Sequence, residues 1–286
     1  MTIIERGARD RMVAPASRAE LLRALGLDSV EGVLSLEGGE IFAESRTTRT
    51  LRVPGESGGK ALFVKIYLFP AMRDVFKGLF RGTFLGRPRA RREFDALSSM
   101  RSAGLEVVEP VAFGRRCEGP FLRAAFIITL ESEVGGVSLD RCRMLFEEPP
   151  GSRARRPLVA GLAELARRMH EANFSHGDFF LRNIILFGPP EAPRFAMLDC
   201  PKAKLSRRTG VLSGAALDDL ASLDAGASAV ASRTERLRFL LKYASQERVT
   251  PRLRAAIAGI RKRRERLSAR ERQRLEAVTA ALRRES

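Results

Sequence analysis

The most informative stretch of the chain is His176-Gly177-Asp178-Phe179-Phe180-Leu181-Arg182-Asn183, and an apolar run over residues 184–187 follows it. A second carboxylate, Asp199, comes after another apolar run at residues 195–198. A His, an Asp two residues later and an Asn five residues beyond that are typical of a phosphotransferase catalytic loop. Phosphoryl transfer needs a carboxylate to orient and deprotonate a hydroxyl, and oxygen ligands to hold Mg²⁺ on the phosphates. The pattern therefore predicts Asp178 as the base, and Asn183 with Asp199 as magnesium ligands.

The two histidines of the chain are interpreted as structural. His176 lies in the loop itself, where we expect it to brace the backbone next to Asp199. His170 ends the preceding helical stretch, and we expect it to be packed or hydrogen-bonded rather than catalytic.

A lysine interrupts an apolar strand pattern at residues 61–68. Period-2 alternation places Phe63, Lys65 and Tyr67 on one face of that strand. Taken alone, Lys65 fits an edge-strand lysine that points to solvent. Beside the catalytic-loop motif, it is predicted to contact nucleotide phosphates, with Glu93 on the following helix as its acidic partner.

Strand patterns dominate residues 32–130, and helical patterns dominate thereafter. This order predicts an α+β, protein-kinase-like bilobal fold: an N-terminal extension at 1–31, a β-rich N-lobe at 32–133, and an α-helical C-lobe at 134–286 with a basic C-terminal helical region. Residues 1–17 are expected to be irregular, and residues 32–36 to form a strand. Gly38-Gly39 does not match G-x-G-x-x-G, so no glycine-rich phosphate loop is assigned.

Composition places the chain among soluble globular proteins. It has 286 residues, 44% of them hydrophobic and 30% charged. It lacks an apolar run of about 18 residues, its N-terminus lacks signal-peptide order, and its three cysteines have no metal-ligand spacing. We therefore expect a cytoplasmic protein with free thiols.

A formal net charge of +17 implies an anionic partner. Residues 248–286 hold 13 Lys and Arg against 4 Glu, and a second basic cluster lies within residues 73–92. Without interleaved aromatic residues, the C-terminal cluster does not support base stacking, which argues against nucleic acid. A solvated helix face and peripheral association with a membrane surface stay open.

Several stretches together resemble the bacterial lipopolysaccharide kinase (Kdo/WaaP) family of the protein-kinase-like superfamily. They are Ser45–Arg52, Phe63–Ile66, Arg92–Leu97 with Gly104 and Pro110–Gly114, the loop from His176 to Asn183 with Leu198-Asp199, Leu217–Leu223 and Arg236–Tyr243. The resemblance covers about residues 32–245.

The resemblance implies transfer of the γ-phosphate of ATP to a sugar hydroxyl, on heptose or Kdo, of the lipopolysaccharide core or a related glycolipid. It implies Asp178 as base, Asn183 and Asp199 as Mg²⁺ ligands, and Lys65 on the ATP phosphates with Glu93 as its partner. It also implies a basic surface for an anionic glycolipid acceptor, which lies at the inner membrane.

Two departures stand out. Cys200-Pro201 follows the metal-binding Asp where regulated protein kinases have Phe-Gly, which argues against an activation-loop switch. A basic insertion at residues 69–88 separates Lys65 from Glu93, and we expect Arg73, Lys77 and Arg81 within it to belong to the acceptor site. The alternatives are another kinase-fold phosphotransferase, aminoglycoside-type or RIO-like, and a pseudokinase that binds a membrane or nucleic acid. The oligomeric state is left open.

Overall fold

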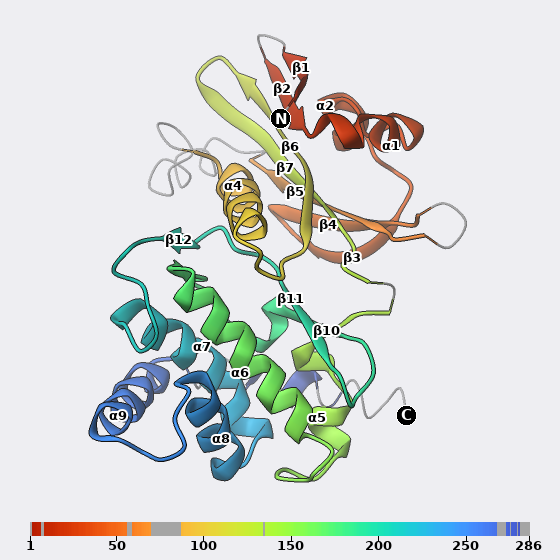
Figure 1. Cartoon of the computed structure of the whole chain (residues 1–286). Coiled ribbons are helices and arrows are strands. Elements are labelled where there is room, and N and C mark those ends of the chain that lie inside the picture. Colours follow the sequence, from red (N-terminus) through yellow and green to blue (C-terminus); the bar gives the residue numbers. More distant parts are fainter. Residues whose placement is uncertain are drawn as a thin grey trace. The chain divides into compact units, whose positions relative to one another are not determined.

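The computed structural model describes residues 2–6, 9–55, 59–69, 87–133, 135–267, 273–274, 276–278 and 280. The chain forms two compact units (Figure 1). The first consists of Met1–Ser99 and Val108–Val134, and the second of Met100–Val107 and Gly135–Ser286. The expected fold class, with a β-rich part and an α-helical part, is confirmed.

An antiparallel sheet of seven strands forms the first unit. In spatial order the strands are β1-β2-β6-β7-β5-β4-β3. Their bounds are β1 Thr2–Arg6, β2 Asp10–Ala14, β3 Glu40–Ser45, β4 Thr48–Val53, β5 Leu62–Leu68, β6 Glu109–Glu118 and β7 Phe121–Leu130. β5, which carries Lys65, lies between β4 and β7. Lys65 is therefore not on an edge strand, and this excludes the alternative of an edge-strand lysine that points to solvent.

The irregular lead-in expected at residues 1–17 is wrong, because β1 and β2 belong to the same sheet. β2 pairs with β6 from Asp10↔Arg116 to Val13↔Phe113. The carboxylate of Asp10 also accepts hydrogen bonds from Arg116, one at 2.6 Å. This pairing is between segments about 100 residues apart, so the local sequence pattern carries little trace of it.

The strand expected at residues 32–36 is also wrong. A short helix, α2 (Val30–Leu34), stands there, and the Ser29 hydroxyl caps it by accepting the Gly32 N–H at 3.0 Å. Val30 and Val33, three residues apart, are fully buried on one side of the helix. Apolar burial at helical spacing therefore outweighs the β propensity of this segment.

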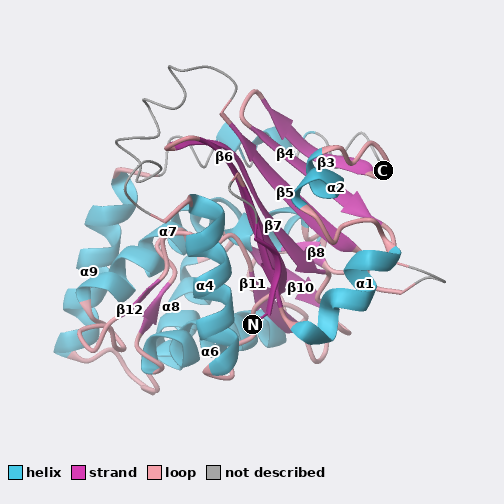
Figure 2. Ribbon diagram, turned by 90° about the horizontal axis from the view of Figure 1, so that it is seen from above, coloured by secondary structure: helices cyan, strands magenta, loops and turns pink. Residues whose placement is uncertain are grey.

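Helices cover the two faces of the sheet (Figure 2). α2 and α1 (Ala19–Ala24) pack on one face, where Leu22 and Val33 share a core with Val64 of β5. α4 (Arg89–Ser102) lies on the other face, where its Phe94 ring packs against Phe113 of β6 at 6.4 Å between centroids. Strand alternation thus sends Lys65 to the α4 side.

The second unit is mainly helical. Its helices are α5 Met144–Glu147, α6 Arg156–Glu171, α7 Gly214–Val230, α8 Arg233–Tyr243 and α9 Pro251–Glu265. α6 buries Leu158, Leu162, Leu165 and Met169 at the spacing of one helix face. Ser213, Ser232 and Thr250 cap α7, α8 and α9, each accepting a backbone N–H in the first turn. The helical character expected of this part of the chain is confirmed.

Short strands join these helices and carry the catalytic-loop motif. They are β8 Val137–Ser138, β9 Phe174–Ser175, β10 Ile184–Phe187, β11 Arg194–Met197 and β12 Lys204–Leu205. They form two small sheets, β11-β10-β8 and β12-β9.

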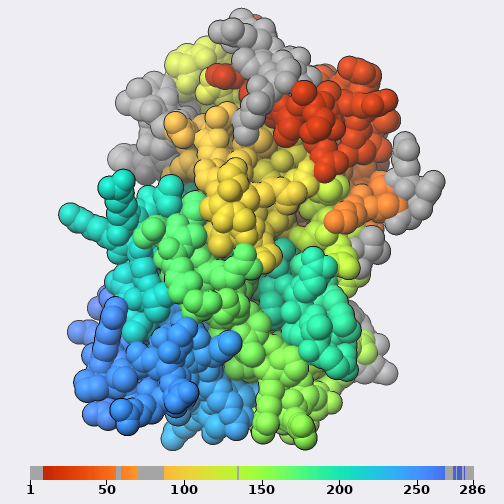
Figure 3. Space-filling model, in the orientation of Figure 1, coloured from red at the N-terminus to blue at the C-terminus, as the bar shows by residue number. Residues whose placement is uncertain are grey.

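α9 lies at the surface of the second unit, in the blue part at the lower left of Figure 3. Its Arg252, Arg254, Arg261 and Lys262 are exposed, whereas Leu253 and Ile260 are buried. Within the described residues, we find no helix of the length and apolarity that a membrane crossing requires.

Candidate active site

A β-hairpin brings two of the predicted site residues together. Asn183 directly precedes β10, Asp199 follows β11, and the strands pair from Ile184↔Met197 onward. The Leu198 N–H also donates to the Asn183 carbonyl at 3.0 Å. Asn183 and Asp199, separated by 16 residues in sequence, therefore lie at the same end of the hairpin.

The donor atoms at this end suit a hard divalent cation. The Asn183 amide group donates from Nδ2 to the backbone carbonyl of Asp178 at 2.8 Å, which leaves its carbonyl oxygen as the atom able to bind a cation. Asp199 supplies a carboxylate and has a positive φ of 53°, an uncommon backbone conformation that concentrates at functional sites. Amide and carboxylate oxygens are ligands that Mg²⁺ uses, together with water and phosphate oxygens. Among the described residues, no group of three or more His, Cys, Asp or Glu could hold a metal, so a cation here would depend on those further oxygens.

His176 braces the loop, in the role expected of it. Its Nε2–H donates to the Leu198 carbonyl at 3.1 Å, and its Nδ1 accepts the Asp178 N–H at 3.3 Å. One ring nitrogen is thus a donor and the other an acceptor, which defines the neutral tautomer. Full burial lowers the pKa of His176, in agreement with this assignment. His176 therefore ties the backbone of Asp178 to the residue before Asp199.

Asp219 on α7 anchors the same loop. The sequence motifs did not predict this role for Asp219. Its carboxylate accepts the backbone N–H groups of His176 at 2.7 Å and Gly177 at 2.8 Å. His170 contacts the same carboxylate, with its Nε2 3.3 Å from Asp219 Oδ2. The other ring nitrogen of His170, Nδ1, lies 2.8 Å from the Tyr243 hydroxyl. All of these side chains are buried.

A sequence signal for Asp219 does exist. It interrupts the apolar stripe of Ala216, Leu220 and Leu223, where an unpaired carboxylate would be costly to bury. An acid at such a position predicts a buried hydrogen-bonding partner, although it does not say which.

The carboxylate of Asp178, the predicted base, forms an ion pair with a lysine. Lys202 Nζ lies 2.9 Å from Asp178, and the ammonium is within that distance of both carboxylate oxygens. No local pattern predicts this contact, because Lys202 is 24 residues away and lies in a turn.

The Lys65–Glu93 pair is formed in the first unit. Lys65 Nζ lies 3.7 Å from Glu93 Oε2, and the Tyr67 hydroxyl donates to the same oxygen at 3.2 Å. Glu93 is buried, and Lys65 also lies against the Tyr67 ring at 5.6 Å from its centroid. Strand alternation and the α4 helix thus bring these side chains together as expected. Arg73, Lys77 and Arg81 of the predicted acceptor site lie outside the described residues.

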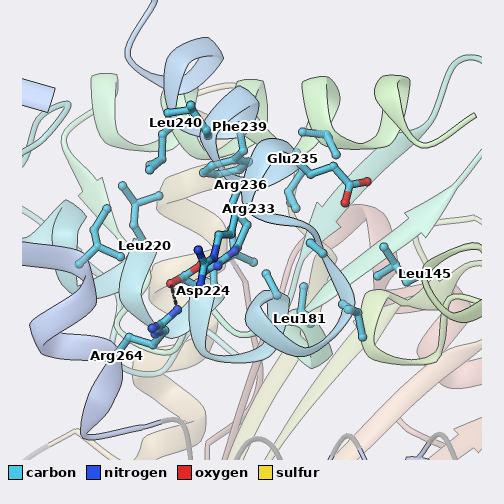
Figure 4. Close-up of a pocket in the computed structure, with 18 of the residues that line it drawn as sticks. Leu145, Leu181, Leu220, Asp224, Arg233, Glu235, Arg236, Phe239, Leu240 and Arg264 are labelled. Atoms are coloured by element: carbon cyan, nitrogen blue, oxygen red, sulfur yellow. Dashed lines mark hydrogen bonds and ion pairs between the residues drawn. The ribbon is translucent and has the colours of Figure 1, made fainter. Parts of the chain in front are cut away.

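The second unit also contains an apolar cavity of about 500 Å³ (Figure 4). Leucines of α6, α7 and α8 line it, among them Leu162, Leu220 and Leu240. Asp224 pairs with Arg236 at 2.9 Å and with Arg264 at 3.0 Å at this cavity. The volume of the cavity lies in the range of small-molecule and cofactor pockets.

Comparisons with known proteins identify the family. The profile of the lipopolysaccharide kinase (Kdo/WaaP) family matches residues 34–236. The lipopolysaccharide core heptose(I) kinase WaaP of Escherichia coli is 34% identical over 64% of this chain and 69% of its own length. WaaP of Pseudomonas aeruginosa is 30% identical over 76% of this chain and 81% of its own. A solved structure, WaaP in complex with acyl carrier protein, aligns with a TM-score of 0.62 and 26% identity over 91% of this chain and 99% of that one. The chain belongs to the lipopolysaccharide kinase (Kdo/WaaP) family and has its kinase-like fold.

Proposed function

We propose that this kinase transfers the γ-phosphate of ATP to a heptose hydroxyl of the lipopolysaccharide core. The observation that carries the proposal is the hairpin that places Asn183 beside Asp199 while the Asn183 side chain holds the backbone of Asp178. Family membership supplies the class of acceptor, and the relatives named above act on heptose(I).

In the proposed reaction each residue has one task. Asp178 hydrogen-bonds the acceptor hydroxyl and takes its proton as the oxygen attacks the γ-phosphorus. Asn183 and Asp199 hold Mg²⁺, which neutralises charge on the phosphates when bound. Lys65 contacts the phosphates, and Glu93 with Tyr67 sets its orientation. His176 and Asp219 keep the loop in place.

The test is phosphate transfer to a core glycolipid that lacks phosphate on its heptose. Purified protein, labelled ATP and Mg²⁺ are incubated with that glycolipid, with a Kdo-only glycolipid, with aminoglycosides and with proteins. We expect label on heptose, and loss of transfer by a factor of about 10³ or more in Asp178→Asn. Asp218→Asn makes the same change at an exposed site and should be silent.

Label on another acceptor would contradict the heptose assignment. Label on Kdo would keep the lipopolysaccharide pathway, whereas label on an aminoglycoside or a protein would favour the other kinase-fold alternatives. Turnover that Asp178→Asn does not affect would remove Asp178 from the chemistry, and nucleotide binding without any turnover would favour the pseudokinase.

We also propose an acyl carrier protein as a partner. The solved WaaP structure contains one, and the apolar cavity of the second unit offers this chain a site of matching chemistry for a carried acyl chain. The lining of the cavity holds five arginines against two acids, Asp224 and Glu235, and this excess of positive charge would suit a negatively charged carrier.

Filling the cavity tests this partner. Ala227 lines it, and Ala227→Phe should weaken binding of acylated carrier protein at least tenfold in a titration, because the ring occupies the space of the chain. Ala229→Phe adds the same ring on the same helix at an exposed position and should bind as the wild type does. Equal binding of acylated and unacylated carrier would remove the cavity from the interaction.

We place the enzyme in the cytoplasm, at the surface of the inner membrane. The exposed basic side chains of α9 support this location, since each Lys or Arg near an anionic surface contributes about 1 kcal/mol. Sedimentation with anionic vesicles, and none with neutral vesicles, is the expected result.

A further inference from the structure

The segment after Asp199 forms a tight turn. The Ala203 N–H donates to the Cys200 carbonyl at 3.1 Å, with Pro201 and Lys202 between them. Proline favours the second position of such a turn because its ring presets φ. Cys200-Pro201, which replaces the Phe-Gly of regulated kinases, thus begins a turn whose third residue is a lysine.

This turn is held at both ends against the catalytic loop. Cys200 Sγ lies 3.3 Å from His176 Nε2, and β12, which begins at Lys204, pairs with β9 just before His176. Between these two contacts the turn packs closely against Gly177, because a Cβ added at Gly177 would lie 2.7 Å from Lys202 Cβ. The turn that carries Lys202 is therefore held on one side by the contact of Cys200 with His176 and on the other by the pairing of β12 with β9, and Lys202 lies against Gly177.

The placement of the ammonium matters more than the strength of the ion pair. Lys202 has a 62% exposed side chain, and an exposed pair contributes at most about 1 kcal/mol to stability. Its Nζ, however, lies within 2.9 Å of the carboxylate that an acceptor hydroxyl must reach to hydrogen-bond distance. An acceptor bound for transfer must therefore approach Asp178 beside this cation.

The loop from His176 to Asn183 contains a single lysine or arginine, Arg182. Its guanidinium stacks on the Phe180 ring, 4.0 Å from the ring centroid. Lys202, by contrast, contacts the Asp178 carboxylate at 2.9 Å.

We propose that Lys202 is a catalytic residue that contacts the phosphoryl group in transfer, an inference that rests on the proposed function. The acceptor oxygen forms a bond to the γ-phosphorus, and its proton passes to the Asp178 carboxylate. The bond from that phosphorus to the bridging oxygen breaks, and its electron pair leaves with ADP. The Lys202 ammonium donates to an equatorial phosphoryl oxygen, where negative charge is concentrated, and exchanges no proton.

The test compares Lys202→Gln, Lys202→Arg and the control Lys204→Gln in the full-length protein. Lys204 is exposed and lies two residues further along, so its replacement removes the same charge from the same segment. With ATP and core glycolipid, we expect Lys202→Gln to lower kcat about 100-fold, with KM for ATP within about twofold. Lys202→Arg should retain about a tenth of the wild-type kcat or more, because the charge is kept while its geometry changes. Thermal unfolding of each variant checks that it is folded.

The proposal is overturned if Lys202→Gln and Lys204→Gln have the same kcat, or if only a KM changes. Wild-type activity on the glycolipid separates this failure from failure of the proposed function. If the wild type does not phosphorylate glycolipid but hydrolyses ATP, the same variants are compared in hydrolysis, where water replaces the hydroxyl. A wild type without any turnover overturns both proposals.

Discussion

The Asp219 carboxylate accepts the backbone N–H of His176 at 2.7 Å, so a residue on α7 determines the conformation of a loop 43 residues before it. The second carboxylate oxygen accepts the next N–H, that of Gly177. Both N–H groups therefore have a buried acceptor, which fixes this part of the loop to the helix that carries the acid.

Asp219→Ala should lower the free energy of unfolding by about 3 kcal/mol or more, because two backbone donors and His170 lose their acceptor. Urea denaturation measures this. The adjacent Asp218, an exposed residue paired with Arg263, offers a matched control, and Asp218→Ala should change stability by less than about 1 kcal/mol. Similar losses in the two variants would contradict the anchoring role.

Stability should fall in mildly acidic solution because of His176. Its pKa is lowered by burial in the folded state, whereas the unfolded chain titrates near pH 6.5. As the pH falls below about 6.5, the unfolded state binds a proton that the folded state does not, so the free energy of unfolding decreases by up to about 1.4 kcal/mol per pH unit.

Urea midpoints between pH 7.5 and pH 5 measure this dependence. His176→Gln keeps an amide donor but cannot titrate, so it should be less stable at neutral pH and lose this part of the slope. An unchanged slope in His176→Gln would assign the pH dependence to other groups.

Lys65→Met should lower kcat/KM for ATP about 100-fold, because the cation that Glu93 and Tyr67 position is lost. Glu93→Gln should act in the same direction and more weakly, since Lys65 stays but loses its charged partner. Steady-state kinetics give both values. Lys60→Met, at an exposed lysine just before β5, should remain within about twofold of the wild type. Equal effects at Lys60 and Lys65 would exclude a specific role for Lys65.

Gly177→Ala should damage both stability and activity. Gly177 has a φ of 78°, and a Cβ there would meet Lys202 Cβ at 2.7 Å. The strained backbone costs about 1–3 kcal/mol, and displacement of the turn should lower kcat by more than about tenfold.

Gly210→Ala is the matched control, because a Cβ at Gly210 meets nothing within 4 Å. Unfolding curves and kcat are measured for both variants and compared with the wild type. A fully active Gly177→Ala protein would show that the loop tolerates the displacement of the turn.

Much of the site was predictable because it depends on local spacing. The hairpin between Asn183 and Asp199 follows from two apolar runs separated by a turn, and strand alternation places Lys65 on one face of β5. The hairpin brings Asn183 and Asp199 together, as their spacing suggested. The errors have a common cause: β2 depends on pairing with β6, and α2 depends on burial of Val30 and Val33, neither of which a short window of sequence contains.

Residue types and their spacings in the amino-acid sequence predict the proposed chemistry: a carboxylate as base, amide and carboxylate oxygens for a cation, and a lysine for phosphates. How the loop is held, and which side chain touches Asp178, follow from the folded chain alone. Asp219 and Lys202 reach the loop from 43 and 24 residues away through helix packing and a turn, and hydrogen bonds between distant segments leave no periodic signal in the chain.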